Sequence, residues 1–283
     1  MIFDTFIYSG ERALLSSRLN QLNSFVDFFV IVESAVTFSG RAREVDLNFR
    51  NQVLDEFGCK IRWIVLDELF GSNSWQREAF QRQSISDGLV DIKKDDIVLL
   101  SDVDEIPSQD FFLSLSNLSP DDVLIAQMRL LRYCSHFESK EKWYGTIATR
   151  YLEQLPDLQS LRMRAVKYWL EKDSKIVVNG GIHFTTFLTS KLYKEKIKSF
   201  SHTELDIFPF NNRCFLLLIL RLGISIDGGE ILRLVREEDS SSIISFCDSK
   251  HRYNNLRERL ARFTQPRIEK LFNERVKNLS TPD

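Results

Sequence analysis

The sequence lacks the features that most quickly assign a protein to a class. Its four cysteines are far apart and form no C-x-x-C pair, which argues against a zinc ribbon or a thiol-redox motif and fits a reducing compartment. Long apolar runs are also missing, since Asp4 interrupts the first one and the run from Phe215 to Leu220 is far too short to cross a membrane. We therefore expect a cytoplasmic protein without a signal peptide or membrane anchor.

Charge imbalance and repetition are absent as well. The formal net charge is −2, which gives no indication of a nucleic-acid partner, and no internal repeat or low-complexity tract is present. What remains is an ordinary globular composition, with 43% hydrophobic and 28% charged residues over 283 positions, enough for a large core. The 22 phenylalanines predict that aromatic packing dominates this core.

Strand-like and helix-like segments alternate in the first part of the chain. Helices are expected at residues 11–22 and around 75–82, and strands at residues 2–8, 28–32, 60–66, 97–102 and 123–131. This order predicts an α/β fold with a mainly parallel sheet and helices on both faces. Residues 144–172 resist assignment. A strand at 176–178 is expected to end in a turn at Asn179–Gly181, so that His183 follows the end of a strand.

The most informative stretch is IVLLSDVDEIP, residues 97–107, in which a buried strand runs directly into Asp102, Asp104 and Glu105. Open α/β sheets bind their ligands at the carboxyl ends of strands, and clustered carboxylates in an apolar setting need a cation to offset them. Mg²⁺ or Mn²⁺ holding a diphosphate satisfies this need, because both ions take oxygen ligands. The motif therefore predicts an enzyme that acts on a nucleotide-linked substrate.

Other interpretations of the acidic turn compete with this one. The simplest is an Asp-rich turn that accepts backbone hydrogen bonds. An EF-hand is excluded, because Pro107 and Leu113 stand where such a loop requires glycine and glutamate. A phosphohydrolase of the haloacid dehalogenase type would use Asp102 as nucleophile, but Ile106 replaces its usual Thr or Val.

Five ordered stretches resemble glycosyltransferase family 17. They are FVIVESAVTFSG (29–40), SWQREAFQR (74–82), LLSDVDEIP (99–107), NGGIHFT (179–185) and KSFSHTE (198–204). The resemblance covers about residues 1–210. It implies a Rossmann-like fold of GT-A type with a mixed sheet, a nucleotide-sugar donor (UDP-N-acetylglucosamine in characterised members), and inversion at the anomeric carbon. Ile182 departs from the family, which often has Trp before the motif histidine.

Inverting transfer needs a neutralised leaving group and a base for the acceptor hydroxyl. Asp104 is expected to coordinate the metal directly, and Asp102 to bind it or the ribose, with Glu105 in support. The histidines expected to complete the metal site are His183 and His202, although each has an ordinary structural role as its alternative. The expected base is Glu204, with Asp206 behind it, because inverting GT-A enzymes commonly place an acid about twenty residues after a glycine pair. A helix-capping or surface carboxylate is the alternative for Glu204.

Four further side chains are assigned to the donor. Glu33 ends a strand and is expected to bind uracil or ribose hydroxyls, whereas Arg77, Glu78 and Arg82 either reach the diphosphate or form helix-surface ion pairs. Trp143 and His136 lie in a polar and aromatic stretch that is suited to stacking on a sugar, with a core role for Trp143 as the alternative.

The expected domains are a catalytic domain over residues 1–210 and a helical C-terminal extension over 211–283. Residues 250–277 are basic and loosely amphipathic, so they either pack on the core as a solvated helix or contact anionic lipid headgroups. We expect the acceptor to be a glycan or lipid-linked glycan of polysaccharide biosynthesis. A catalytically inactive glycan-binding protein on the same fold is the second alternative.

Overall fold

The computed structural model describes residues 1–133, 137–166, 174–185, 208–209, 212–225 and 230–234. The chain forms two compact units. The first comprises Met1–Arg129, Lys142–His183 and Ser199–Thr203, and the second comprises Leu130–Glu141, Phe184–Lys198 and Glu204–Asp283. The expected boundary after residue 210 stays a prediction, because most of the chain beyond it lies outside the described residues, including the basic segment 250–277.

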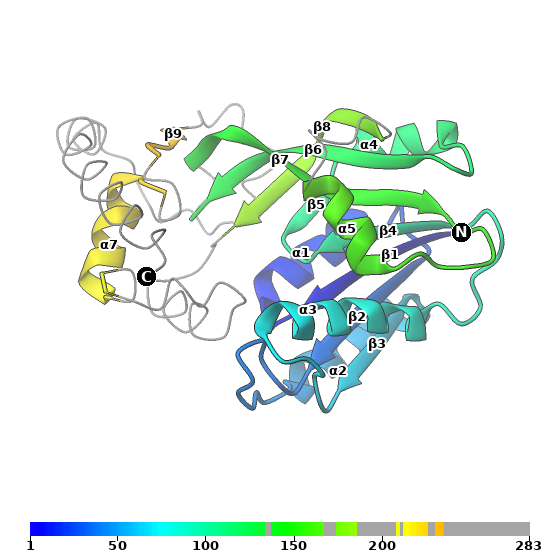
Figure 1. Ribbon diagram of the computed structural model, residues 1–283, viewed down its shortest axis with the longest axis horizontal. Coiled ribbons are helices and arrows are strands. Elements are labelled where there is room, and N and C mark those ends of the chain that lie inside the picture. Colours follow the sequence, from blue (N-terminus) through cyan, green and yellow to red (C-terminus); the bar gives the residue numbers. More distant parts are fainter. Residues whose placement is uncertain (134–136, 167–173, 186–207, 210–211, 226–229, 235–283) are drawn as a thin grey trace. The chain divides into compact units, whose positions relative to one another are not determined.

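The first unit begins with four parallel strands (Figure 1). They are β1 (Ile2–Tyr8), β2 (Phe28–Ser34), β3 (Ile61–Leu66) and β4 (Ile97–Asp102), and they lie in the order β3-β2-β1-β4. Nearly every residue of β1, β2 and β4 is buried, as expected for strands covered on both faces. The chain proceeds from β1 outward through β2 to β3 on one side of β1 and then returns to place β4 on its other side. The strand order therefore reverses between β1 and β4.

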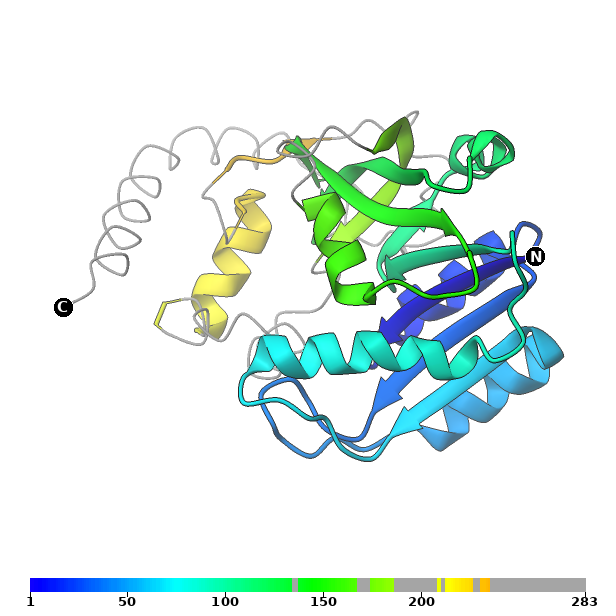
Figure 2. The same cartoon turned by 45° about the vertical axis from the view of Figure 1, so that its right-hand side comes forward.

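Helices cover both faces of these strands. They are α1 (Arg12–Leu22), α2 (Leu47–Phe57) and α3 (Ser74–Gln83), with short 3₁₀ turns η1 (Gly58–Lys60) and η2 (Ser84–Gly88). In Figure 2, α3 (cyan) lies in front of the parallel strands and α2 (light blue) lies behind them. Asp46 and Asn73 cap the amino ends of α2 and α3 by accepting hydrogen bonds from backbone N–H groups.

The rest of the sheet begins with an antiparallel partner of β4. Strands β5 (Glu105–Pro107), β6 (Val123–Arg132), β7 (Phe137–Arg150) and β8 (Lys175–Thr185) extend the sheet in the order β4-β7-β6-β8-β5. The helical elements here are α4 (Gln109–Ser114), η3 (Leu115–Asn117) and α5 (Leu158–Val166). Helix α5 lies beside α3, so two helices from distant parts of the sequence border the end of β4.

The core of the first unit is mainly aliphatic, so the expected dominance of aromatic packing is not borne out, although several phenylalanines contribute. Phe3, Phe6, Phe29 and Phe111 are wholly buried, and a cluster of valine, isoleucine and leucine side chains from β2, β4, β6 and β7 packs with Phe3. The predicted fold class is confirmed: α/β, with a mixed sheet whose parallel half is flanked by helices.

The described part of the second unit contains α7 (Arg213–Leu222) and β9 (Arg233–Leu234). Asn212 caps the start of α7, and Gly223 ends it in the left-handed conformation, with the ring of Phe137 against its Cα. Strand β9 pairs antiparallel with β7 at Phe137 and Glu138. Within the residues the structure describes, no helix is long and apolar enough to span a membrane.

Two expectations about elements are corrected. The turn expected at Asn179–Gly181 is part of β8, which continues through it. Strand β8 lies between β6 and β5 there. A Cβ on Gly180 would lie 2.9 Å from the Cα of Ala126 in β6. A Cβ on Gly181 would lie 2.4 Å from the carbonyl oxygen of Ile106 in β5. The glycines therefore permit close strand packing. His183 consequently lies within β8, not after a strand end.

Several elements were not anticipated. Helix α2, the short strand β5 and helix α4 had no counterpart in the sequence-based assignment, and the unassigned stretch after residue 143 contains half of β7 and the whole of α5. Helix α2 supplies the crossover that the parallel pairing of β2 and β3 requires.

Candidate active site

The acidic turn lies at the point where the strand order reverses. Asp102 is the last residue of β4 and pairs in register with Ile7 of β1, while Glu105 is the first residue of β5. Val103 is buried between them and anchors the turn in the core. Ligands of open α/β sheets bind at such a reversal, outside the carboxyl ends of the strands.

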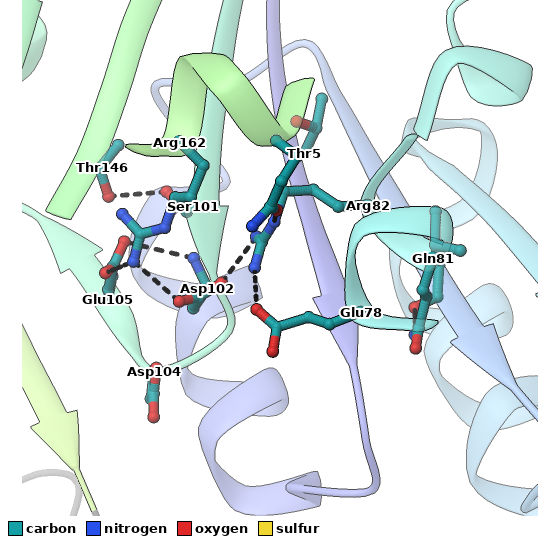
Figure 3. A network of polar contacts seen from close by, with 12 residues as sticks. Thr5, Glu78, Gln81, Arg82, Ser101, Asp102, Asp104, Glu105, Thr146 and Arg162 are labelled. Carbon is teal, nitrogen blue, oxygen red and sulfur yellow. Dashed lines mark hydrogen bonds and ion pairs between the residues drawn. The ribbon is translucent and has the colours of Figure 1, made fainter. Parts of the chain in front are cut away.

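Arginines hold both carboxylate oxygens of Asp102 (Figure 3). Arg82 Nη1 of α3 donates to Oδ1 at 2.9 Å, and Arg162 Nη2 of α5 donates to Oδ2 at 2.8 Å. Burial acts to raise the pKa of Asp102, but the charges of Arg162 and Arg82 outweigh it and hold the pKa far below the ordinary value. Asp102 is therefore a carboxylate whose charge is balanced by the protein itself.

Glu105 is wholly buried and shares one of these arginines. Arg162 Nη2 lies 2.5 Å from its Oε1, which also accepts a hydrogen bond from Trp143 Nε1 at 2.6 Å. Its other oxygen accepts the backbone N–H of Asp102 at 3.2 Å, which closes the turn. Gly145 of β7 leaves the room for this carboxylate, because a Cβ there would lie 2.8 Å from the Glu105 Cδ.

Arg82 is fixed by three partners. Besides Asp102, it donates to Glu78 Oε1 at 2.8 Å and through Nε to Gln159 Oε1 at 2.9 Å, and its side chain is 2% exposed. The ion pair between Glu78 and Arg82 is therefore present, but Arg82 is buried, so it is not the helix-surface pair that was given as the alternative. Direct contact of these two residues with a diphosphate stays a prediction.

Asp104 and His183 face each other beside the turn. Strand register pairs Glu105 with His183, and this brings His183 Nε2 to 3.4 Å from Asp104 Oδ1. The ring centroids of His183 and Trp143 are 4.5 Å apart, which fixes the imidazole against the indole. Within the described part of the chain, the buried His183 Nδ1 has no hydrogen-bond partner.

The chemistry of this pair suits a divalent cation. A carboxylate oxygen and an imidazole nitrogen are ordinary ligands of Mn²⁺, and ions that hold nucleotide phosphates take few protein ligands. Among the described residues, no group of three His, Cys, Asp or Glu side chains is arranged to hold a metal by itself. The pair therefore fits an ion that is shared with a substrate better than a structural metal site.

A second polar cluster lies at the ends of β1 and β2. Glu33 is buried, accepts a hydrogen bond from Trp63 Nε1 at 3.1 Å and lies 3.7 Å from Arg43 Nη2. Burial raises the pKa of Glu33, with the charge of Arg43 and the Trp63 hydrogen bond opposing the rise.

A small cavity of about 40 Å³ adjoins this cluster, lined by Ser9, Val36, Thr37, Phe38, Arg43 and Gln81. Arg77 fixes the loop beside it by donating to the carbonyl of Phe38 at 3.0 Å. The structure thus gives Arg77 a loop-bracing contact. A role for Glu33 or Arg77 in binding the donor stays a prediction.

The structure describes only some of the site residues that the sequence predicted. Asp102, Asp104, His183, Glu78 and Arg82 belong to one cluster, whereas His202, Glu204, Asp206 and His136 lie outside the described residues. Arg162 was missed, because a single arginine in an unassigned stretch carries no local signal. The positive charge that offsets the acidic turn was expected from a divalent ion, whereas Arg82 and Arg162 supply it at Asp102, and Arg162 supplies it at Glu105. A metal ion at Asp104 stays a prediction.

The sequence matches the model of one known protein family. The sequence model of glycosyltransferase family 17 matches residues 1–211. No curated protein matches the chain.

The solved structures that are similar to this chain have low sequence identity and low TM-scores. HddC from Yersinia pseudotuberculosis is 11% identical, with 63% of this chain and 90% of that one covered, at a TM-score of 0.35. The inositol-1-phosphate CTP transferase from T. maritima is 13% identical, with 69% and 95% covered and a TM-score of 0.34. A protein designated a nucleotide-diphospho-sugar transferase from Desulfovibrio desulfuricans G20 is 11% identical, with 77% and 95% covered and a TM-score of 0.38. Scores this low carry no argument about function.

Proposed function

Since the chain belongs to glycosyltransferase family 17 and is therefore an enzyme that uses a nucleotide-sugar donor, we propose that it transfers N-acetylglucosamine from UDP-N-acetylglucosamine. The acceptor in this proposal is a glycan or a lipid-linked glycan, and the configuration at the anomeric carbon is inverted. The observation that carries the proposal is the acidic turn at the strand reversal between β1 and β4, with Asp104 facing His183.

Asp104 and His183 are the described residues that would hold a divalent cation, Mn²⁺ or Mg²⁺. When bound, the ion supplies positive charge to the diphosphate as it leaves. His202 stays a further proposed ligand. Support for the pair comes from its donor chemistry and from the indole of Trp143, which fixes the imidazole that Asp104 faces.

Asp102 has a different role in this proposal. Its two oxygens already accept from Arg82 and Arg162, but a carboxylate accepts about four hydrogen bonds and the Asp102 side chain is 31% exposed. It is thus suited to accept a ribose hydroxyl from the donor on its open side. Its low pKa keeps it an acceptor at every working pH.

Glu204 is the proposed base for the acceptor hydroxyl, with Asp206 behind it. Replacing a general base typically costs about 10²–10⁴-fold in rate. Glu204→Gln is therefore expected to lower kcat strongly while the affinity for UDP is retained, and Asp206→Asn is the matched comparison. Equal losses in both variants would contradict the assignment.

Thermal-shift screening of nucleotide sugars, with Mn²⁺ and with EDTA, tests the donor and the metal together. UDP-N-acetylglucosamine is expected to give the largest rise in Tm, and only with Mn²⁺. Asp104→Asn should abolish the Mn²⁺-dependent rise, whereas Asp110→Asn, which removes an exposed carboxylate from the first turn of α4, should preserve it. A larger shift with a different nucleotide sugar would overturn the donor assignment.

The two alternative functions are distinguished by other measurements. A phosphohydrolase would trap beryllium fluoride on Asp102, but both oxygens of that carboxylate are held by arginines, which disfavours it as a nucleophile. An inactive glycan-binding protein would bind glycan equally well after Asp104→Asn. Location in the cytoplasm, and contact of residues 250–277 with anionic membrane, are further proposals that cell fractionation would test.

A further inference from the structure

A charged residue occupies the buried face of α1. Arg18 follows Leu14 and Leu15 and precedes Leu22 on the stripe of α1 that packs on the sheet, and its side chain is completely buried. Its guanidinium carbon lies 4.7 Å from the centre of the Phe6 ring. A buried arginine is costly unless its donors are satisfied, so the positions of its partners matter.

Asp4 of β1 accepts hydrogen bonds from two of the three guanidinium nitrogens of Arg18. Arg18 Nε donates to Asp4 Oδ2 at 2.8 Å and Nη2 donates to Oδ1 at 2.6 Å, and both side chains are wholly buried. This parallel, two-bond arrangement fixes the plane of the guanidinium. It also determines the direction of the remaining nitrogen, Nη1.

Arg18 Nη1 bonds to both ends of the acidic turn. It donates to the backbone carbonyl of Asp102 at 3.2 Å and to the backbone carbonyl of Glu105. These are the first and last residues of the four-residue segment that contains Asp104. One nitrogen on α1 therefore ties the turn at both ends, while the side chains of Asp102 and Glu105 are held separately by Arg162.

We propose that Arg18, oriented by Asp4, is a positioning residue for sugar transfer. It fixes the backbone of the turn from Asp102 to Glu105 and thereby the direction in which Asp104 meets His183 and the donor. The inference rests on the proposed function of that turn. Replacing a buried ion pair by apolar residues is often neutral for stability, so a contribution to stability is a poor reason for the presence of Asp4 and Arg18 here. The geometry that the pair imposes on the turn is a better reason.

Arginine is required for this role because of its shape. Its planar fork presents five N–H donors, enough to satisfy Asp4 and two carbonyls at once, whereas the three donors of lysine sit on one nitrogen. Arg18→Lys therefore keeps the charge opposite Asp4 but loses the simultaneous contacts to the turn.

Arg62 provides a matched control in the same unit. It donates to both oxygens of Asp91 at 2.5 and 2.9 Å and to the carbonyl of Gly88 at 2.8 Å, and it lies 4.1 Å from the centre of the Phe28 ring. It belongs to β3, which β2 and β1 separate from β4. Arg62→Lys thus removes a similar set of contacts away from the acidic turn.

Hydrogen exchange and ligand binding together test the proposal in the full chain. In Arg18→Lys, the amides of residues 102–106 should exchange at least about tenfold faster, and those of residues 61–66 should be unchanged. Loss of a supporting contact of this kind weakens metal binding by about 10- to 100-fold, so the Kd for UDP with Mn²⁺ should rise by that factor. Arg62→Lys should show neither effect.

A double variant separates positioning from folding. Asp4→Leu combined with Arg18→Met replaces the ion pair by apolar side chains, and it should retain Tm while the amides of residues 102–106 still exchange faster and the Kd for UDP with Mn²⁺ still rises. Unchanged amide exchange in residues 102–106, or equal effects in the Arg18 and Arg62 variants, would overturn the inference. If the wild-type chain bound neither UDP nor Mn²⁺, the proposed function would fail, and the exchange comparison would still decide whether Arg18 fixes the turn.

Discussion

Buried arginines distinguish this site at the scale of single residues. Arg18, Arg82 and Arg162 are each at most 5% exposed, and each contacts the backbone or the side chain of the acidic turn. Asp102 among these partners is held ionised and in place before any ligand arrives, so little reorganisation is needed on binding. Removing one arginine would leave carboxylates buried without their counter-charge, which is far more costly than losing a surface ion pair.

Glu33 gives a prediction about pH. Burial raises its pKa, so the protonated form is favoured in the folded state, and its contribution to stability is full at low pH and is lost as the pH rises through the folded pKa. Glu33→Gln stays neutral and keeps an acceptor for Trp63 Nε1. The free energy of unfolding of the variant, relative to wild type, should therefore increase from about pH 4, near the ordinary pKa of glutamate, to pH 7.

Urea unfolding at several pH values measures this difference. Glu44→Gln, which removes an exposed carboxylate from the neighbouring loop, is the control and should show a smaller trend. A relative stability of Glu33→Gln that is flat or falls with pH would show that Arg43 and Trp63 outweigh burial.

At the scale of elements, strand register brings the site together. The pairing of β5 with β8 sets Glu105 opposite His183, and the glycines of β8 allow it to lie between β6 and β5. The same glycine pair was expected to form a turn, because the dipeptide Gly-Gly is typical of turns. The neighbouring strands decide between the two outcomes, and they are distant in the sequence.

Gly181→Ala tests this register. The residue has φ +156°, and a Cβ would lie 2.4 Å from the carbonyl oxygen of Ile106, so β5 or β8 must shift. We expect a loss of about 2–4 kcal/mol in the free energy of unfolding, above the ordinary range for point variants. Gly10→Ala is the control, since its φ is +98° but no atom lies within 4 Å of a new Cβ. It should cost only about 1 kcal/mol from backbone strain.

Urea denaturation of the two variants separates the clash from the strain. Similar losses for both would mean that β5 and β8 adjust easily. In that case Gly181 would not be needed to place His183 beside the acidic turn.

At the scale of the whole molecule, binding should be linked to stability. A ligand that binds only the folded state stabilises it by about 2.7 kcal/mol at 100 times its Kd. We expect UDP with Mn²⁺ to raise the free energy of unfolding by this amount in equilibrium urea unfolding, and EDTA to remove most of the gain. Equal stabilisation by UDP in EDTA would mean that the chain binds the nucleotide without a metal.

The sequence by itself determined the class of the fold and the family. Alternating apolar segments specify buried strands and their covering helices, and the acidic turn follows β4 as predicted, because both depend on residues that are neighbours in the chain. Membership of glycosyltransferase family 17 follows from motifs of the same local kind.

Only the tertiary structure decided which side chains meet at the turn. Arg18 reaches it from α1, Arg162 from α5 and His183 from β8, across separations of 84, 60 and 79 residues from Asp102 or Asp104. No local pattern marks Arg18 or Arg162, since arginines are mostly partly exposed elsewhere. The NGGIHFT motif marked His183, but it did not show which carboxylate the imidazole faces. Their partners are selected by strand order and register, which arise from the packing of the whole sheet.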